Sequence, residues 1–437
     1  MNEYGDNSRV KILVTGAAGF VGSHLVRALR AHGYQLLCCG RNAERLRAVC
    51  PDCTVIPADF SRNQQMEQWL PHLQGVAVVI NAAGIFQERG LNTFAAVHRD
   101  GPIALFQAAE QAGVQRIVQI SALGADEYAT THYHLTKRAA DEALATLATK
   151  WVILQPSIIY GDGAKSPAFL SALATLPITP LVGEGNQLLQ PVSIDDVTTA
   201  VLHLVRPTAT AGVTLAAVGS NALTLRSMLE ALRQWLGLRP TAALQIPLWL
   251  VRLVARIGQI FRWQFVHPAA VSMLCRGNVA DPTPFGRVLG TTPRSFTESF
   301  QTRPCRTADR WHASLYFLRP VLRLSIACVW IIAGVISLWV YPREASESLL
   351  VQVGFSQELA PYLLSFLAVG DIGLGLGTLL KWHLPATVAI QLCLITGYSL
   401  VIAITLSEFM VHPFGPVVKN LPLFVATLVM LALEGER

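Results

Sequence analysis

The chain has 437 residues and a formal net charge of +6, and only 14% of its residues are charged while 52% are hydrophobic. Soluble proteins carry about 25% charged residues and rarely reach this length in one domain, so we expect two domains, a soluble one followed by one in a membrane. The sequence has no block of Lys and Arg with interleaved aromatic residues, which argues against a nucleic-acid partner.

The start of the chain, MNEYGDNSRVKILV, lacks a positive segment followed by an apolar core and a cleavage site, so we expect no secretory signal peptide. The eight cysteines are scattered, and Cys50 and Cys53 form a C-x-x-C without a second pair to complete a zinc site. We therefore expect reduced thiols in a loop and no metal site.

From Arg9 to about Gln155, short runs rich in β-branched residues alternate with helical stretches. Strands that alternate with helices predict right-handed crossovers and a doubly wound parallel sheet with helices on both faces, an α/β fold. The six expected strands are VKILVTG, YQLLCCG, CTVIPAD, VAVVINAAG, RIVQISAL and WVILQPSIIYG.

From about residue 161 to 310 the chain is less regular and richer in Pro and Gly, and we expect a small substrate region that completes a domain of residues 1–310. Within it, Pro247–Trp263 places Arg252, Arg256 and Arg262 among large apolar residues. Two interpretations stay open for this segment, a helix in the membrane interface or a lid over the substrate cleft.

Residues 311–437 carry four apolar runs and predict an all-α four-helix transmembrane bundle, because about 20 apolar residues cross the hydrocarbon core. The fourth run must extend back through Lys419, with this lysine snorkelling or paired inside. Asp371 lies within the second run and could pair with Lys419 or stay protonated, while Gly373 and Gly377 favour close helix packing. The expected spans are about 321–341, 359–380, 384–406 and 414–433.

The distribution of charge predicts the orientation of the spans. On one side of the membrane, the ends of the expected spans are flanked by Arg319, Arg323 and Lys381, and the chain ends in Arg437. The first loop on the other side, YPREASESLL, is net acidic. The positive-inside rule then places both termini and the first domain in the cytoplasm, on a multi-pass protein of the cell inner (plasma) membrane.

Gly16, Gly19 and Gly22 form a G-x-x-G-x-x-G between a strand and an amphipathic helix. The first glycine allows a tight turn, the second lets the backbone approach a pyrophosphate, and the third permits close packing of the helix on the strand. This position after a strand makes a dinucleotide site the favoured interpretation.

The second strand ends in Gly40 followed by Arg41, where an NAD-binding protein would carry an acidic residue for the ribose 2′-hydroxyl. An arginine suits a 2′-phosphate, so NADP(H) is favoured over NAD(H). Asp59 ends the third strand, where it could reach the adenine amino group, and NAAG, residues 81–84, ends the fourth along the cofactor.

Tyr133 and Lys137 form a Y-x-x-x-K that puts both side chains on one face of a helix. A nearby ammonium lowers the pKa of a tyrosine, which could then exchange a proton with a substrate carbonyl, while the lysine could also bind the nicotinamide ribose. Ser121, at the end of the fifth strand, could bond the same oxygen. We expect His132 and His134 to be ordinary surface or cleft histidines.

Five motifs in order, TGAAGFVGSHL, NAAG, QISALGAD, YHLTK and QPSIIYGDG, resemble the short-chain dehydrogenase/reductase superfamily. Over residues 9–220 the chain is most similar to its atypical or extended branch, which includes the NADPH-binding accessory subunit of respiratory complex I. This resemblance implies a nucleotide-binding Rossmann fold, catalysis by Tyr133 and Lys137, and Pro156 and Ser157 beside the nicotinamide. Ser121 is followed by Ala122, where extended members usually carry more hydroxyls, and some atypical members bind the cofactor without evident turnover.

Residues 320–433 resemble the DoxX-like four-helix membrane family through GDIGLGLGTLLKW and PFGPVVKNLPLFVATLVMLALE. Together with the motifs above, the resemblances give a set of expected site residues. The expected catalytic residues are Tyr133, Lys137 and Ser121. The expected cofactor-binding residues are Gly16, Ala18, Gly19, Phe20, Val21, Gly22, Arg41, Asp59, Phe60, Ala82, Ala83, Gly84, Tyr133, Lys137, Pro156 and Ser157.

Three accounts explain why a nucleotide domain would be fixed in a bilayer. In the favoured account, an NADP(H)-dependent oxidoreductase acts on a lipid-soluble carbonyl or quinone-type substrate. In the second, a catalytically silent NADPH-binding domain is a sensor or an assembly module of a membrane complex, with a membrane protein partner. In the third, the membrane part is a separate carrier or oxidase component, fused for co-localisation.

Overall fold

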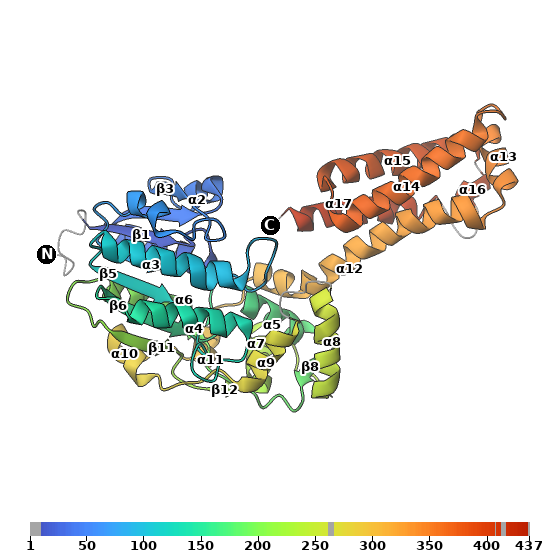
Figure 1. The fold of residues 1–437 in the computed structure, drawn as a ribbon. Helices are drawn as coiled ribbons and strands as arrows, with labels where there is room; N and C mark the ends of the chain where they lie inside the picture. The colour runs from blue at the N-terminus through green and yellow to red at the C-terminus, as the bar shows by residue number, and fades with distance from the viewer. Residues whose placement is uncertain (1–9, 261–265, 407, 412–416, 436–437) are drawn as a thin grey trace. The chain divides into compact units, whose positions relative to one another are not determined.

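The computed structural model describes residues 10–260, 266–406, 408–411 and 417–435 (Figure 1). The chain divides into two compact units, Met1–Ala313 and Ser314–Arg437, and each is described by itself. Several positions discussed above lie outside the described residues. These are the first nine residues, Arg262, Trp263, residues 414–416 of the fourth expected span, and Arg437.

The N-terminal unit is built on a sheet of seven strands in the order β11-β6-β5-β4-β1-β2-β3, with every neighbouring pair parallel. The six expected strands are present, except that the sixth ends at Pro156 and its last part, Ile159–Tyr160, pairs in a separate small sheet. β11 adds a seventh strand at one edge, so the expected α/β fold is confirmed. The strands are β1 (Lys11–Thr15), β2 (Gln35–Gly40), β3 (Thr54–Pro57), β4 (Val78–Asn81), β5 (Arg116–Ile120), β6 (Lys150–Pro156) and β11 (Val213–Ala217).

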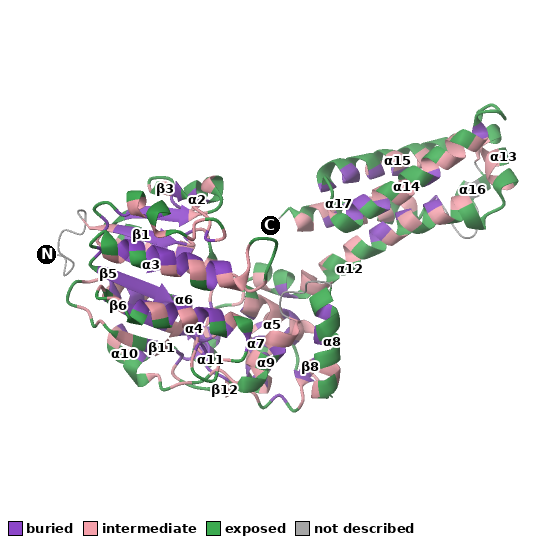
Figure 2. Ribbon diagram, in the orientation of Figure 1, coloured by how far each residue is buried: buried purple, intermediate pink, exposed green. Residues whose placement is uncertain are grey.

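Side chains of β1 alternate between the two faces of the sheet, as a strand covered on both sides requires. Ile12 and Val14 pack in one core cluster with Leu25, while Leu13 packs in a second cluster with Leu105. Figure 2 shows the strands buried between helices whose outer faces are exposed. The helices between these strands are α1 (Phe20–Ala31), α2 (Ala43–Val49), η2 (Met66–Gln68), η3 (Leu70–His72), η4 (Ala95–Asp100), α3 (Gly101–Gln111), α4 (His132–Ala145) and α6 (Ile194–Leu204).

The smaller region has a core of its own around Tyr160, Leu229 and Phe296, beside three two-stranded sheets. The strand pairs are β7 (Ile159–Tyr160) with β10 (Val192–Ser193), β9 (Leu188–Leu189) with β12 (Leu223–Thr224), and β8 (Thr179–Val182) with β13 (Ala243–Ile246). The helices of this region are α5 (Lys165–Thr175), α7 (Leu225–Trp235), α8 (Leu248–Ile260), α9 (Pro268–Arg276) and α11 (Phe296–Thr302), whereas α10 (Thr283–Leu289) packs against α6 in a core cluster of the seven-stranded sheet.

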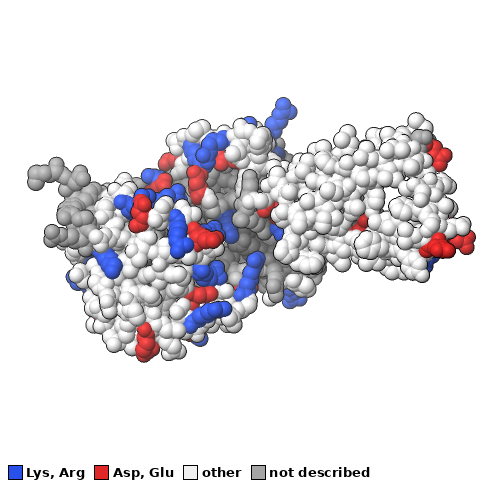
Figure 3. Space-filling view, turned by 90° about the horizontal axis from the view of Figure 1, so that it is seen from above, with Lys and Arg blue, Asp and Glu red and all other residues white. Residues whose placement is uncertain are grey.

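The C-terminal unit is helical, and Figure 3 shows few charged side chains on its visible face. Three of the described helical stretches, Thr307–Val340, Ala360–Leu380 and Leu384–Thr405, are long and apolar enough to cross a membrane, whereas Asn420–Glu434 is a shorter apolar helix. The elements are α12 (Thr307–Val335), η5 (Ile336–Val340), α13 (Arg343–Val353), α14 (Ala360–Leu380), α15 (Leu384–Thr405), α16 (Glu408–Val411) and α17 (Asn420–Glu434).

Two glycines set the close packing of α12 against α14. A Cβ atom at Gly334 would lie 2.4 Å from the Ala368 carbonyl oxygen, and one at Gly375 would lie 2.8 Å from the Ala327 carbonyl oxygen. A Cβ atom at Gly373, by contrast, would meet nothing within 4 Å. Small residues do bring these helices together as expected, but Gly375 is the contact rather than Gly373.

Asp371 is not paired with Lys419. No ion pair joins the two among the described residues, and the Asp371 Oδ1 atom is buried without a hydrogen-bond partner there. Lys419 is exposed at the start of α17, so of the two sequence-based alternatives the ion pair is wrong.

We expect Gly22→Ala to destabilise the N-terminal unit. Alanine normally stabilises a helix relative to glycine, but a Cβ atom here would lie 2.1 Å from the Gly16 carbonyl oxygen. The resulting overpacking should cost about 1–3 kcal/mol and lower the melting temperature of the full chain in detergent. Gly40→Ala is the control, because its Cβ would make an ordinary 3.5 Å contact with Leu46. Equal melting temperatures for the two variants would contradict the packing argument.

Candidate functional site

The turn between β1 and α1 forms a cradle at the carboxyl edge of the sheet. Gly16 adopts a φ of +64°, and a Cβ atom there would lie 2.7 Å from the Ala82 carbonyl oxygen, so only glycine fits this turn. α1 begins at Phe20 with neither a side-chain cap nor an acidic residue in its first turn. Its first amides and its positive dipole end therefore stay available to a phosphate group.

A chain of buried hydrogen bonds runs from this turn to α4. Thr15 Oγ1 donates to Asn81 Oδ1 at 2.5 Å, and Asn81 Nδ2 donates to Gln119 Oε1 at 2.7 Å. Gln119 Nε2 reaches Asp141 Oδ1 at 3.5 Å, and the Ser121 hydroxyl donates to the other oxygen of Asp141. The ends of β1, β4 and β5 are thus tied to the helix that carries Tyr133 and Lys137.

Tyr133 lies among aromatic rings at the start of α4. Its ring centroid is 5.2 Å from Phe86, 5.9 Å from Phe94 and 5.2 Å from His98. The Lys137 Nζ atom lies 5.8 Å from the Tyr133 ring centroid and donates to the Ile120 carbonyl oxygen at 3.2 Å. The predicted pair therefore shares one corner, in which Tyr133 is half-buried and Lys137 is buried against the end of β5.

Burial dominates the titration of both groups. It raises the pKa of Tyr133 above its usual value and lowers the pKa of Lys137 to about 8, with the Asp141 carboxylate opposing the second change. The expectation that the ammonium lowers the pKa of the tyrosine is therefore wrong for this structure. A tyrosine with a raised pKa keeps its proton at neutral pH, which suits a proton donor.

Ser121 has a role that the sequence did not suggest. Its hydroxyl, on a side chain only 4% exposed, holds the carboxylate of Asp141. Burial raises the pKa of Asp141 to about 6, while the bond from Ser121 and the charge of Lys137 oppose this change. Asp141 is a site residue that sequence reasoning missed, although its spacing of four from Lys137 places it on the same helix face.

The other expected cofactor residues lie at the carboxyl ends of their strands. Arg41 follows β2 and its Nη1 atom donates to Asn92 Oδ1 at 2.9 Å, while Asp59 follows β3 and accepts from the Ser61 amide at 3.0 Å. Phe60 is buried, with its ring 5.3 Å from that of Trp69.

The turn after β4 lies next to the glycine cradle and to the lysine. A Cβ atom at Gly16 would lie 2.7 Å from the Ala83 Cα atom, and one at Gly84 would lie 3.9 Å from Lys137 Nζ. Pro156 ends β6 and its carbonyl oxygen accepts from the Leu123 amide at 2.9 Å, while the Ser157 hydroxyl donates to the Gln190 carbonyl oxygen at 2.5 Å.

Two buried histidines flank the tyrosine. His98 is 2% exposed, its Nε2 atom accepts from the Ile85 amide at 3.0 Å, and burial lowers its pKa to about 2. His134 is 3% exposed and its ring lies 5.3 Å from that of Tyr133, which excludes the surface alternative for this residue, and burial lowers its pKa to about 4. Both rings are thus neutral at physiological pH, whereas His132 is exposed as expected.

Cys50 and Cys53 are joined in a disulfide, with their Cα atoms 5.4 Å apart, so the expectation of reduced thiols is wrong for this structure. The α2 helix ends at Val49, and the turn that follows brings the two residues within bonding reach. The buried Cys38 of β2 places a third sulfur within 4.8 Å of both.

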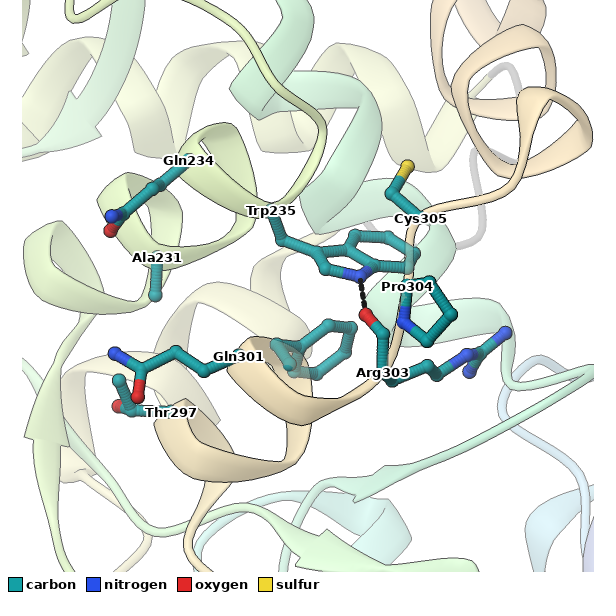
Figure 4. Close-up of a pocket in the computed structure, with 9 residues that line it drawn as sticks. Ala231, Gln234, Trp235, Thr297, Gln301, Arg303, Pro304 and Cys305 are labelled. Atoms are coloured by element: carbon teal, nitrogen blue, oxygen red, sulfur yellow. Dashed lines mark hydrogen bonds between the residues drawn. The ribbon is translucent and has the colours of Figure 1, made fainter.

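A cavity of about 330 Å³ lies in the smaller region, between α7 and the end of α11 (Figure 4). Trp235, Phe300 and Arg303 line it, and the Trp235 Nε1 atom donates to the Arg303 carbonyl oxygen at 2.9 Å. None of its lining residues belongs to the expected site, so this cavity is separate from the Tyr133 corner.

Residues 16–176 match a family described as NAD(P)H-binding, and residues 327–428 match one described as DoxX-like. The chain joins an NAD(P)H-binding Rossmann domain to a DoxX-like domain. The expected resemblance is confirmed at this level, and the apolar helices fit a membrane protein.

Similar proteins agree with this assignment. The ceramide reductase of Caulobacter vibrioides is 27% identical over 240 residues, which is 54% of this chain and 73% of that protein. Subunit 9 of the NADH dehydrogenase [ubiquinone] 1 alpha subcomplex of Arabidopsis thaliana is 27% identical over 242 residues, which is 52% of this chain but only 59% of that subunit. The NADPH-dependent quinone oxidoreductase QOR2 of Escherichia coli, complexed with NADPH, has a TM-score of 0.54 at 19% identity over 66% of this chain and 98% of that one, and shows the shared fold.

The cradle fits the dinucleotide that this family binds. The space beside Gly16 and Gly22 admits no side chain, and the uncapped start of α1 offers amides to a pyrophosphate. Lys137 contacts the end of β5, at the same edge of the sheet as the glycine cradle, and Tyr133 lies next to it on α4.

We expect Asp141→Asn to shift the pH dependence of NADPH binding. The Asp141 carboxylate raises the pKa of Lys137, so its neutral replacement lowers that pKa and the lysine loses its proton at lower pH. If the ammonium holds the ribose, the NADPH affinity of the parent should begin to fall at about pH 8 as the pH rises. The affinity of the variant should begin to fall at a lower pH. One pKa unit corresponds to a loss of up to about tenfold in affinity near pH 8.

NADPH fluorescence titrations between pH 6 and about 9.5 measure this shift. Glu142→Gln is the matched control, because this neighbouring carboxylate is exposed and pairs with Arg138. If NADPH affinity fell at the same alkaline pH in Asp141→Asn as in the parent, Asp141 would not set the charge of Lys137.

Proposed function

We propose that the chain is a membrane-anchored NADP(H)-dependent reductase that acts on a lipid-soluble carbonyl or quinone-type substrate. The observation that carries this proposal is the Tyr133–Lys137 pair beside the glycine cradle, in a chain with three apolar helices long enough to span a bilayer. The similarity to a ceramide reductase supports a lipid as the substrate class. An anchored domain would meet such a substrate where it is most concentrated.

The glycine turn at Gly16 and Lys137 would hold NADPH, which would supply the hydride for reduction of a carbonyl carbon. Tyr133, protonated because burial raises its pKa, donates its proton to the carbonyl oxygen as negative charge develops there. Lys137, with a pKa of about 8, is mostly charged at neutral pH, and its attraction for the phenolate that remains offsets part of the larger cost of burying that charge. Phe86 and Phe94 pack against the tyrosine ring.

Arg41 supports NADP(H) as the preferred cofactor. Its side chain is exposed at the end of β2, where the adenosine ribose of a bound dinucleotide belongs, and it can exchange its bond to Asn92 for one to a 2′-phosphate.

The exposed face of α8 supports the interfacial interpretation of this helix. Trp249, Leu253 and Ile257 are 67%, 47% and 42% exposed, whereas a helix tucked over a cleft would bury such residues. We infer that this helix lies on the membrane surface. The positive-inside rule puts the ends of the spans that Lys and Arg flank on the cytoplasmic side of the inner membrane. The nucleotide domain and both termini then belong in the cytoplasm.

A second candidate function is a catalytically silent NADPH-binding module of a membrane complex, with a membrane protein as its partner. The bond of Ser121 to Asp141 favours it, because this hydroxyl is then occupied and not offered to a substrate. The similarity to a subunit of NADH dehydrogenase supports a protein partner.

We expect Tyr133→Phe to abolish NADPH oxidation and to leave NADPH binding within about twofold of the parent. Loss of the proton donor should reduce turnover by about 10²–10⁴-fold. The assay follows NADPH consumption by the detergent-solubilised chain with ceramide-like lipid carbonyls and soluble quinone analogues. Tyr128→Phe is the control, because this ring is 71% exposed. Binding in both proteins with turnover in neither would support the silent module.

We expect Arg41→Ala to weaken NADPH binding by about tenfold to a hundredfold, the equivalent of losing a charged hydrogen bond. NADH, which lacks the 2′-phosphate, should bind the variant and the parent equally. Fluorescence titration with each cofactor gives both affinities, and Arg47→Ala, exposed on the last turn of α2, is the control. An equal loss for NADH and NADPH would refute a 2′-phosphate contact.

A further inference from the structure

Three cysteine sulfurs lie together on one face of the seven-stranded sheet. Cys38 belongs to β2, and Cys50 and Cys53 lie in the turn after α2. Their Sγ atoms all lie within 4.8 Å of one another. Cys38 and Cys50 are 1% and 0% exposed and belong to one core cluster, against which the partly exposed Cys53 packs. Cys39, the neighbour of Cys38 on β2, belongs to the core cluster on the opposite face.

Backbone hydrogen bonds hold the three residues near one another. Cys38 is paired on both sides within the sheet, because β2 lies between β1 and β3. The Cys50 amide donates to the Leu46 carbonyl oxygen at 3.0 Å at the end of α2, and the Cys53 amide donates to the Cys50 carbonyl oxygen at 3.4 Å. None of these bonds involves a sulfur atom, so we expect the three sulfurs to stay together when the Cys50–Cys53 disulfide is broken.

The disulfide is the oxidised state of this cluster. The cytoplasm keeps thiols reduced, and the occurrence of the reduced state there rests on the cytoplasmic location proposed above. A dithiol reductant gives two electrons and two protons, so the S–S bond breaks, Cys50 and Cys53 become thiols, and the reductant becomes a disulfide. Together with Cys38, three free thiols then lie side by side.

Three sulfurs at this spacing suit a soft metal ion. An ion at the centre of a triangle of sulfurs, with bonds of about 2.3 Å, separates the sulfurs by about 4 Å, a spacing compatible with the 4.8 Å limit of this cluster. Thiolates select soft ions such as Cu(I) and Zn²⁺. A structural Zn²⁺ site takes four protein ligands, but no fourth His, Cys, Asp or Glu joins the three sulfurs within the described part of the chain. Cu(I) is satisfied by three sulfur ligands, so it fits the cluster better.

We propose that Cys38, Cys50 and Cys53, when reduced, form a binding site for a Cu(I) ion. Each sulfur that binds the ion releases its proton to solvent, because the thiolate is the ligand. The partly exposed Cys53 gives the ion a route from solvent to the two buried sulfurs. The site uses no residue of the Tyr133 corner, so its test does not depend on reductase activity.

The first test offers Cu(I) or Zn²⁺ to the reduced full-length chain in detergent, without oxygen, against a chromogenic chelator of each ion. We expect the chain to retain Cu(I) and to lose Zn²⁺ to its chelator. Oxidation to the Cys50–Cys53 disulfide should release the Cu(I), because two of its three ligands are then joined to each other. Retention of Zn²⁺ in place of Cu(I) would overturn the choice of ion, and retention of neither ion would overturn the site.

Two neighbouring cysteines of β2 give a matched pair of variants. Cys38→Ala removes one of the three ligands and should weaken Cu(I) retention by more than about tenfold, a loss that even an outer-shell partner of a metal site can cause. Cys39→Ala makes the same change one residue along the strand, on the opposite face of the sheet, and should bind as the parent does. Equal weakening in both variants, or in neither, would refute the three-sulfur site.

X-ray absorption at the copper edge needs no variant, so it decides the matter even where Cys38→Ala does not fold. The reduced parent is loaded with less than one equivalent of Cu(I), so that the strongest site fills first. We expect three sulfur neighbours around the ion. Two sulfur neighbours would show that Cys50 and Cys53 bind it without Cys38, and this result would contradict the proposal.

Discussion

The candidate site depends on the buried hydrogen bonds that run from Thr15 through Asn81 and Gln119 to Asp141. Thr15, Asn81 and Gln119 lie at or next to the carboxyl ends of three adjacent parallel strands, where the hydrogen bonds between strands end. Each buried polar group would be costly without its neighbour, so the chain fixes the turn after β1, the turn after β4 and the helix α4 relative to one another. The cofactor cradle and the Tyr133 corner are therefore parts of one rigid arrangement.

That arrangement also decides how the titratable groups behave. Coulombic attraction between Lys137 and a phenolate would favour an ionised tyrosine, but desolvation acts on both groups and is the larger effect here. Asp141 offsets part of this penalty for the lysine, and Ser121 offsets part of it for Asp141. The result is a protonated tyrosine beside a lysine whose pKa of about 8 lies well below its usual value.

The glycine pattern, the strand periodicity and the apolar runs were sufficient to predict the fold class, because each is a local consequence of backbone sterics or hydrophobic burial. The failures involve partners distant in sequence. Gly373 and Gly375 are both glycines of α14, so the sequence does not distinguish them. Only the rotation of α14 against α12 decides that Gly375 is the one in contact with α12. The role of Ser121 depends on a carboxylate twenty positions along the chain, and the partner of Lys381 is Glu434 rather than any residue of its own helix. Hydrophobic periodicity predicts which face of one helix or strand is buried, whereas these contacts depend on how two elements pack against each other.

The two units differ in how far their buried polar atoms are paired, and the difference bears on their stability. In the N-terminal unit, Asp141 accepts from three side chains, and the cost of its burial is shared. In the helical unit, three buried atoms lack a hydrogen-bond partner among the described residues. They are Asp371 Oδ1, Trp330 Nε1 and Oε1 of the fully buried Gln391. An anchor needs only apolar side chains, and each unpaired polar atom in a bilayer lowers its stability. Among the described residues, polar atoms buried without partners on α12, α14 and α15 therefore cost the helical unit stability, whereas the shared hydrogen bonds of Asp141 reduce that cost in the N-terminal unit.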